Sequence, residues 1–132
     1  MTQLLVIPGE LPSLNQVIAS SKQRRKSKGK WVPGAPYAEL KRIHTMSVWA
    51  LARAAKLKPV KRPVILHFLW VRDDKRTDPD NVSGGGRKSV LDGLVEAGVL
   101  PRDSWQWIKG FTDEFAVDRD NPRTEVWIVE AE

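Results

Sequence analysis

Two carboxylates stand one residue apart near the middle of this basic chain. Asp78 and Asp80 flank Pro79 in the run TDPDN at 77–81. Carboxylate oxygens are hard ligands, and Mg²⁺ usually takes one or two of them together with waters and substrate phosphates. A bound divalent ion can activate water and neutralise charge during phosphodiester hydrolysis. The pair therefore predicts a metal site, and the basic charge of the chain favours phosphodiesters as its substrates.

The neighbours of the pair indicate how its carboxylates point. A residue before proline is pushed toward an extended conformation, and residues two apart in an extended segment face the same side. We therefore expect Asp78 and Asp80 to lie in a rigid extended segment with both carboxylates on the same side. Asn81 would orient a carboxylate or bond to backbone. An EF-hand fits worse, because three positions of its template, counted from Asp78, hold other residue types. A simple solvated turn stays open as the alternative.

Length and composition limit the class of protein. The chain has 132 residues, of which 41% are hydrophobic and 29% charged, as expected of one globular domain. The absence of cysteine excludes a disulfide scaffold, a thiolate zinc site and a cysteine nucleophile. The sequence shows neither a signal-peptide pattern nor an apolar run long enough to span a bilayer, so we expect a cytoplasmic protein. The net charge of +6 favours nucleic acid as a partner.

Much of the positive charge lies in one segment that is almost free of apolar residues. Such a segment cannot pack into a core, so we expect a mobile basic loop over about 20–33. Its role is either solubility or a grip on DNA phosphates through release of counterions, and we favour the grip. Its six cations are Lys22, Arg24, Arg25, Lys26, Lys28 and Lys30.

The apolar pattern predicts an α/β fold with a mixed sheet and two helices. Strands are expected at 3–7, 64–71, 105–115 and 124–129, and helices at 34–57 and 87–97, in the order β-α-β-α-β-β. The run 64–71 is apolar on both faces and indicates a central strand. The acidic pair follows the carboxyl end of that strand, where α/β folds tend to bind ligands. The last two strands are expected to pair as an antiparallel hairpin.

Three glycines, Gly84 to Gly86, precede the second predicted helix. Their spacing is not that of a P-loop, so nucleotide hydrolysis has little support. A flexible glycine arm that opens a helix would nevertheless let backbone N–H groups meet a phosphate.

The order of the polar residues resembles the RusA family of Holliday junction resolvases over about 11–129. These are small dimeric, Mg²⁺-dependent endonucleases that are common in phages and prophages. The stretch between Asn81 and Lys88 is longer than in the family, and one acid stands where the family often has two. The matching residues are Pro12, Ser13, Asn15, Asp78, Asp80, Asn81, Lys88, Asp92, Leu94, Ala97, Gly98 and Asp103.

The resemblance implies a role for each matching polar residue. Asp78, Asp80 and Asp103 would be catalytic metal ligands for Mg²⁺, with Mn²⁺ as an expected substitute, and Lys88 would be the catalytic lysine. Supporting roles would fall to Asn15, Asn81 and Asp92. It further implies a homodimer that resolves four-way DNA junctions in a bacterial host or a phage-infected cell.

Two other functions stay open. A related nuclease would prefer flaps, forks or other branched DNA. A noncatalytic DNA-binding module would need neither the acids nor a metal.

Overall fold

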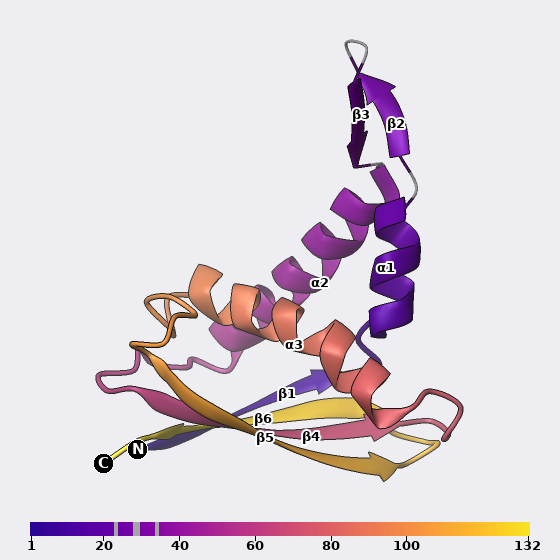
Figure 1. Cartoon of the computed structure of the whole chain (residues 1–132). Helices are drawn as coiled ribbons and strands as arrows, with labels where there is room; N and C mark the ends of the chain where they lie inside the picture. Colours follow the sequence, from indigo (N-terminus) through magenta and orange to yellow (C-terminus); the bar gives the residue numbers. More distant parts are fainter. Residues whose placement is uncertain (23, 28–29, 34) are drawn as a thin grey trace.

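One mixed sheet carries the helices on one of its faces (Figure 1). We describe a computed structural model of residues 1–132, in which residues 23, 28–29 and 34 and the side chains of 21–37 lie outside the described part. The strand order is β1-β6-β4-β5, with β4 parallel to β5 and β6 antiparallel to both β1 and β4. The four strands are β1 Thr2–Pro8, β4 Val64–Arg72, β5 Ile108–Val117 and β6 Arg123–Glu130. The predicted α/β class and mixed sheet are confirmed.

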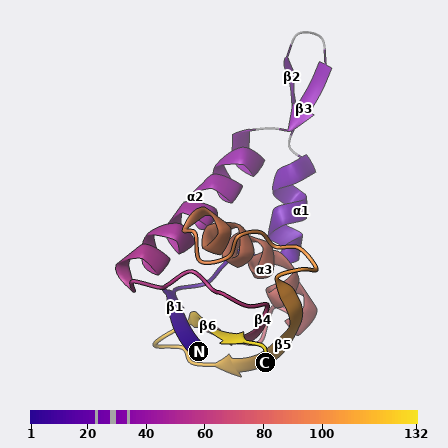
Figure 2. The ribbon, with the colours of Figure 1, turned by 90° about the vertical axis from the view of Figure 1, so that its left-hand side faces the viewer.

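The described helices form two layers above the sheet (Figures 1 and 2). α3 (Pro79–Glu96) lies on the sheet, and α1 (Leu14–Lys22) and α2 (Ala35–Ala54) pack against α3. The two predicted helices correspond to α2 and α3, and α1 is an additional helix. None of the helices in the described part is long and apolar enough to cross a membrane.

The segment expected to be a basic loop has regular backbone structure. α1 runs through Lys22, and β2 (Arg24–Ser27) pairs antiparallel with β3 (Lys30–Pro33). The prediction of a loop over about 20–33 is therefore wrong for the residues of α1, β2 and β3, and the mobility of this segment stays a prediction. Figures 1 and 2 show this hairpin beyond the ends of α1 and α2, away from the sheet.

The core lies between the sheet and α3. On β4, residues 64, 66, 68 and 70 face the helices and are buried. Val90 and Leu94 of α3 are fully buried against them, and Gly98 ends this helical region with a φ of 77°. α2 contributes Val48 and Ala52.

The pairing predicted for the last two strands is wrong. β4 lies between β5 and β6, so those two strands do not touch as a hairpin. The chain leaves β4, crosses the sheet as α3 and returns as β5 parallel to β4, which is the usual βαβ connection. The turn at 118–122 then carries β6 to the other side of β4. The apolar pattern of a strand marks its buried face but does not name its neighbour, which explains the error.

α3 begins eight residues before the predicted start. Asp78 is its N-cap with φ −64° and ψ 149°, and Pro79 occupies the first turn, where a missing N–H costs nothing. Asp80 also lies in that turn, where a carboxylate interacts favourably with the helix dipole. The acidic pair thus lies at the start of a helix, and the predicted rigid extended segment is wrong.

The glycine run lies inside α3 because of close packing. A Cβ atom on Gly85 would stand 2.1 Å from the carbonyl oxygen of Pro12, and one on Gly86 would stand 2.6 Å from the Trp70 ring. Gly93 meets Val48 of α2 in the same way, at 2.4 Å. The hypothesis of a flexible glycine arm that opens a helix is therefore wrong, since these glycines let α3 approach its neighbours.

Candidate active site

Asp78 and Asp80 are exposed at the start of α3, at the edge of the sheet where β4 ends (Figure 1). The neighbouring hollow, of about 550 Å³, is lined by Thr77, Pro79 and Val82 and by the end of β5, Phe115–Val117. The pair therefore lies close to the carboxyl ends of β4 and β5. The region beyond the carboxyl ends of the strands is a common place for ligands in α/β folds.

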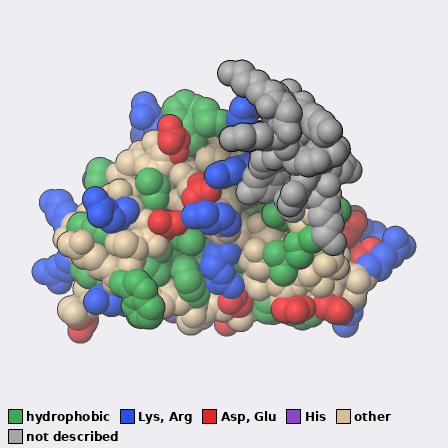
Figure 3. All heavy atoms as spheres, turned by 45° about the horizontal axis from the view of Figure 1, so that its top comes forward, with side chains coloured by type: hydrophobic (Ala, Val, Ile, Leu, Met, Phe, Trp, Pro, Cys, Tyr) green, Lys and Arg blue, Asp and Glu red, His purple; other side chains and the backbone are tan. Residues whose placement is uncertain are grey.

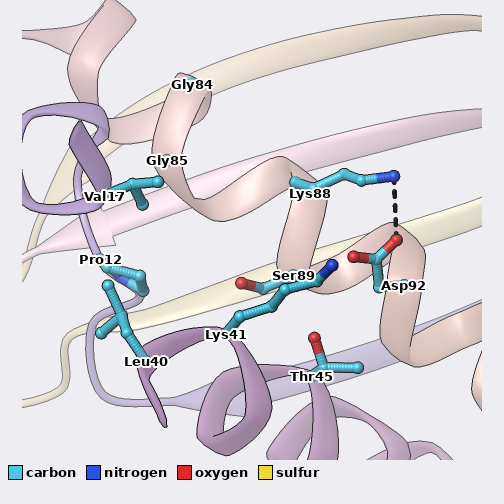
Figure 4. Close-up of a pocket in the computed structure, with 10 residues that line it drawn as sticks. All are labelled: Pro12, Val17, Leu40, Lys41, Thr45, Gly84, Gly85, Lys88, Ser89 and Asp92. Atoms are coloured by element: carbon cyan, nitrogen blue, oxygen red, sulfur yellow. Dashed lines mark ion pairs between the residues drawn. The ribbon is translucent and has the colours of Figure 1, made fainter. Parts of the chain in front are cut away.

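Lys88 joins two other carboxylates farther along α3. Its Nζ lies 3.0 Å from Oδ1 of Asp92, one helical turn on, and 2.9 Å from Oδ2 of Asp103 (Figure 4 shows the first pair). Asp103 comes from the loop after α3, which folds back beside the helix. On the face that Figure 3 shows, Lys and Arg side chains stand interleaved with Asp and Glu over the described part of the surface. The contact with Asp92 joins residues four apart on one helix, whereas the contact with Asp103 depends on the tertiary structure.

This contact changes the proton affinities of both partners. The hydrogen bond from Lys88 is the main reason that the pKa of Asp103 is lowered. The pKa of Lys88 is raised, chiefly by the hydrogen bond to Asp103 and then by the one to Asp92, against a smaller effect of desolvation. Lys88 is therefore a cation and Asp103 an anion at neutral pH.

We expect Lys88→Ala to raise the pKa of Asp103 toward its ordinary value, as measured by NMR titration of the carboxyl group. A carboxyl whose folded pKa is lowered adds stability above its unfolded pKa and loses it as the pH falls. Lys88→Ala should cost about 0.5 kcal/mol of unfolding free energy at pH 7, because the pair is largely exposed. The difference from the wild type should shrink below about pH 4. An unchanged pKa of Asp103 would contradict the contact.

The structure does not bring the predicted metal ligands together within one chain. From Asp78 to Lys88 there are ten residues, about 15 Å along a helix. In the described part of the chain, no group of three or more His, Cys, Asp or Glu side chains is placed to hold a metal ion. Asp78 and Asp80 thus form one acidic position, and Asp103 with Lys88 and Asp92 forms another.

The Pro-Ser-x-Asn run has a clear local role. The Ser13 hydroxyl accepts a hydrogen bond from the backbone N–H of Gln16 at 3.2 Å, and the Gln16 side chain accepts one from the Ser13 N–H at 2.8 Å. This reciprocal arrangement is a capping box that starts α1. The spacing Ser13-x-x-Gln16 was the signal that could have predicted this helix. Asn15 lies exposed in its first turn.

For most of the predicted DNA-binding cations, only the backbone is described. The backbone places Arg24, Arg25 and Lys26 on β2 and Lys30 on β3, whereas Lys28 lies outside the described residues. The side chains of all six cations also lie outside the described part. Their contact with DNA stays a prediction.

Sequence reasoning missed a cavity between the three helices. It has a volume of about 120 Å³ and is lined by residues of α1, α2 and α3 together with Pro12 (Figure 4). The Oγ1 atom of Thr45 on its wall is buried and has no hydrogen-bond partner among the described residues. Lys41 and Thr45 belong to no motif, so the sequence held no signal for this site.

Comparison of the sequence with known protein families and with curated proteins found no match.

Proposed function

We propose that this chain is an Mg²⁺-dependent endonuclease that resolves four-way DNA junctions. The observation that carries the proposal is the pair of exposed carboxylates, Asp78 and Asp80, at the start of α3 beside the carboxyl ends of β4 and β5. The net charge of +6 suits a polyanionic substrate, and the basic hairpin would add phosphate contacts. The order of acids, Asn and Lys that resembles the RusA family supports the same activity.

The chemistry of the donors fits Mg²⁺, which takes oxygen ligands and only a few carboxylates. Asp78 and Asp80 of one chain, with Asp103 from a second, would hold it. The ion would supply an activated water and neutralise charge on the phosphate that is cut. Lys88 keeps Asp103 ionised and fixes its position, because it donates to Oδ2 at 2.9 Å.

A dimer offers a way to unite the two acidic positions. β5 is an edge strand whose residues 111–117 are all exposed, including Phe111 and Phe115 at 41% and 42%. Trp105, near its start, is 94% exposed. The other edge, β1, is partly covered, because Gln3 exchanges two hydrogen bonds with the backbone of Lys58. β5 also carries the charged residues Lys109, Asp113 and Glu114. An edge strand has unpaired backbone groups that can pair with another chain, and with the exposed Phe111 and Phe115 they lead us to infer that β5 joins two copies.

A twofold axis through β5 would pair the two copies antiparallel. The start of β5 would then lie beside the end of the partner's β5. Asp103 lines a hollow with residues 108–111, and Pro79 lines one with residues 115–117. In this proposed dimer, Asp103 of one chain would therefore lie near the partner subunit's Asp78 and Asp80. Each dimer would have two such sites, as paired cuts in a junction require.

A noncatalytic DNA-binding module is the second candidate. The observation that favours it is the separation of Asp103 from Asp78 and Asp80 within one chain. In that case the acids would be structural, as a helix start and as partners of Lys88.

Cleavage assays separate these functions. Asp78→Asn, Asp80→Asn and Asp103→Asn should each reduce cleavage of a four-way junction in Mg²⁺ by at least about a hundredfold, because each removes a metal ligand. DNA binding should persist or tighten, because repulsion of phosphate falls. Activity of the wild type in EDTA, or of any one variant at the wild-type level, would contradict the assignment. Forks and flaps of the same sequence should be cut more slowly if junctions are the substrate.

A further inference from the structure

The cavity between the helices has one apolar and one polar wall. Pro12, Val17 and Leu40 form the apolar wall, and Lys41, Thr45 and Ser89 contribute to the polar wall (Figure 4). Its volume of about 120 Å³ exceeds the roughly 30 Å³ that a water molecule occupies in the liquid. The space therefore suits a small polyatomic ligand.

The polar wall presents hydrogen-bond donors. The Thr45 hydroxyl is buried and has no partner in the described part of the chain, an arrangement that costs free energy unless water or a ligand satisfies it. Ser89 is 9% exposed and lines the same cavity. Figure 4 shows the Thr45 hydroxyl pointing from α2 toward α3, with the Lys41 side chain crossing the gap beside Ser89.

The charges around the cavity favour an anion. Lys41 forms no ion pair with any described residue, so its ammonium group is available to a ligand. Asp92 also lines the cavity, but its carboxylate already pairs with Lys88 at 3.0 Å. The free groups are therefore one cation and two hydroxyls, a set that suits the oxygens of a phosphate.

We propose that this cavity binds a phosphate group, with the Thr45 and Ser89 hydroxyls donating to its oxygens and Lys41 balancing its charge. The group would be inorganic phosphate or a backbone phosphate of a DNA strand. The second identity rests on the proposed endonuclease function, and it would anchor the strand next to Lys88.

Titration with inorganic phosphate tests the cavity itself. Backbone amide NMR signals of Lys41, Thr45 and Ser89 should shift and saturate with phosphate, and not with chloride at equal ionic strength. Thr45→Val should weaken the affinity about tenfold or more, because a hydrogen bond to a charged group is lost. Thr45→Ser, which keeps a hydroxyl, should bind like the wild type. No saturable shift at these residues, or equal affinity in Thr45→Val, would overturn the proposal.

Charge variants supply the matched control. Lys41→Gln should also weaken phosphate binding about tenfold. Lys61→Gln removes the same charge from an exposed turn that does not line the cavity, and it should bind phosphate like the wild type. Equal weakening by both variants would assign the effect to overall charge and overturn the site.

DNA binding then identifies the source of the phosphate. If a DNA phosphate occupies the cavity, Lys41→Gln should reduce the slope of log affinity against log salt by about 0.9 on duplex DNA. An unchanged slope with loss of phosphate binding would support the cavity and overturn its assignment to DNA. The acid variants should keep phosphate binding even if they never cut DNA, so failure of the nuclease proposal would be seen separately.

Discussion

Mixing two inactive variants, Asp78→Asn and Asp103→Asn, should restore DNA cleavage to about one quarter of the wild-type level if subunits pair at random in a symmetric dimer. In a mixed dimer, one site would carry both substitutions and the other would carry none. Half of the dimers would be mixed, and each would have one intact site. The measurement is single-turnover cleavage of a junction after the two variants have exchanged subunits.

The control for this complementation is a second mixture. Asp78→Asn with Asp80→Asn should remain inactive, because both substitutions fall in the same half of each site and neither site in the mixed dimer is intact. Light scattering should show dimers in both mixtures. Restored cleavage in both mixtures, or in neither, would contradict a site shared between subunits. A site formed within one chain predicts no restoration, since every subunit would then be defective.

Gly85→Ala should lower the unfolding free energy by about 3 kcal/mol or more. The added Cβ would lie 2.1 Å from the Pro12 carbonyl oxygen, 2.2 Å from the Ser13 carbonyl carbon and 2.5 Å from the Leu14 backbone nitrogen. Backbone atoms cannot move aside as a flexible side chain can, so α3 would have to lift from the start of α1. Urea denaturation of the two proteins measures the loss.

The neighbouring glycine provides the matched control. A Cβ on Gly84 would meet only the Leu14 side chain, at 3.4 Å, which is an ordinary contact distance. Gly84→Ala should therefore gain up to about 1 kcal/mol from the better helix propensity of alanine. Equal losses in both variants would mean that the glycines matter for a reason other than the approach of the Pro12 segment.

Local patterns in the sequence were sufficient to predict most of the secondary structure. The continuous apolar run at 64–71 predicted β4, because a strand at the centre of a sheet needs apolar residues. The predicted helix at 87–97 corresponds to the second half of α3, because the helical spacing of Val90, Leu91 and Leu94 and a glycine that can take positive φ at Gly98 are local properties. The pair Asp78 and Asp80 could also be recognised from the sequence, because its two acids are only two residues apart.

Contacts between distant segments decided the rest. The sequence alone disfavoured a helix through Gly84–Gly86, because glycine is a poor helix former, yet α3 begins at Pro79 so that its glycines can pack on Pro12 and Trp70. The place of β4 between β5 and β6 also depends on pairing that no local pattern encodes. Lys88 meets Asp103 only because the loop after α3 folds back along the helix, and the same fold keeps Asp103 apart from Asp78 in one chain. Residue type and spacing thus determined the candidate chemistry, whereas tertiary packing decided which of those side chains meet.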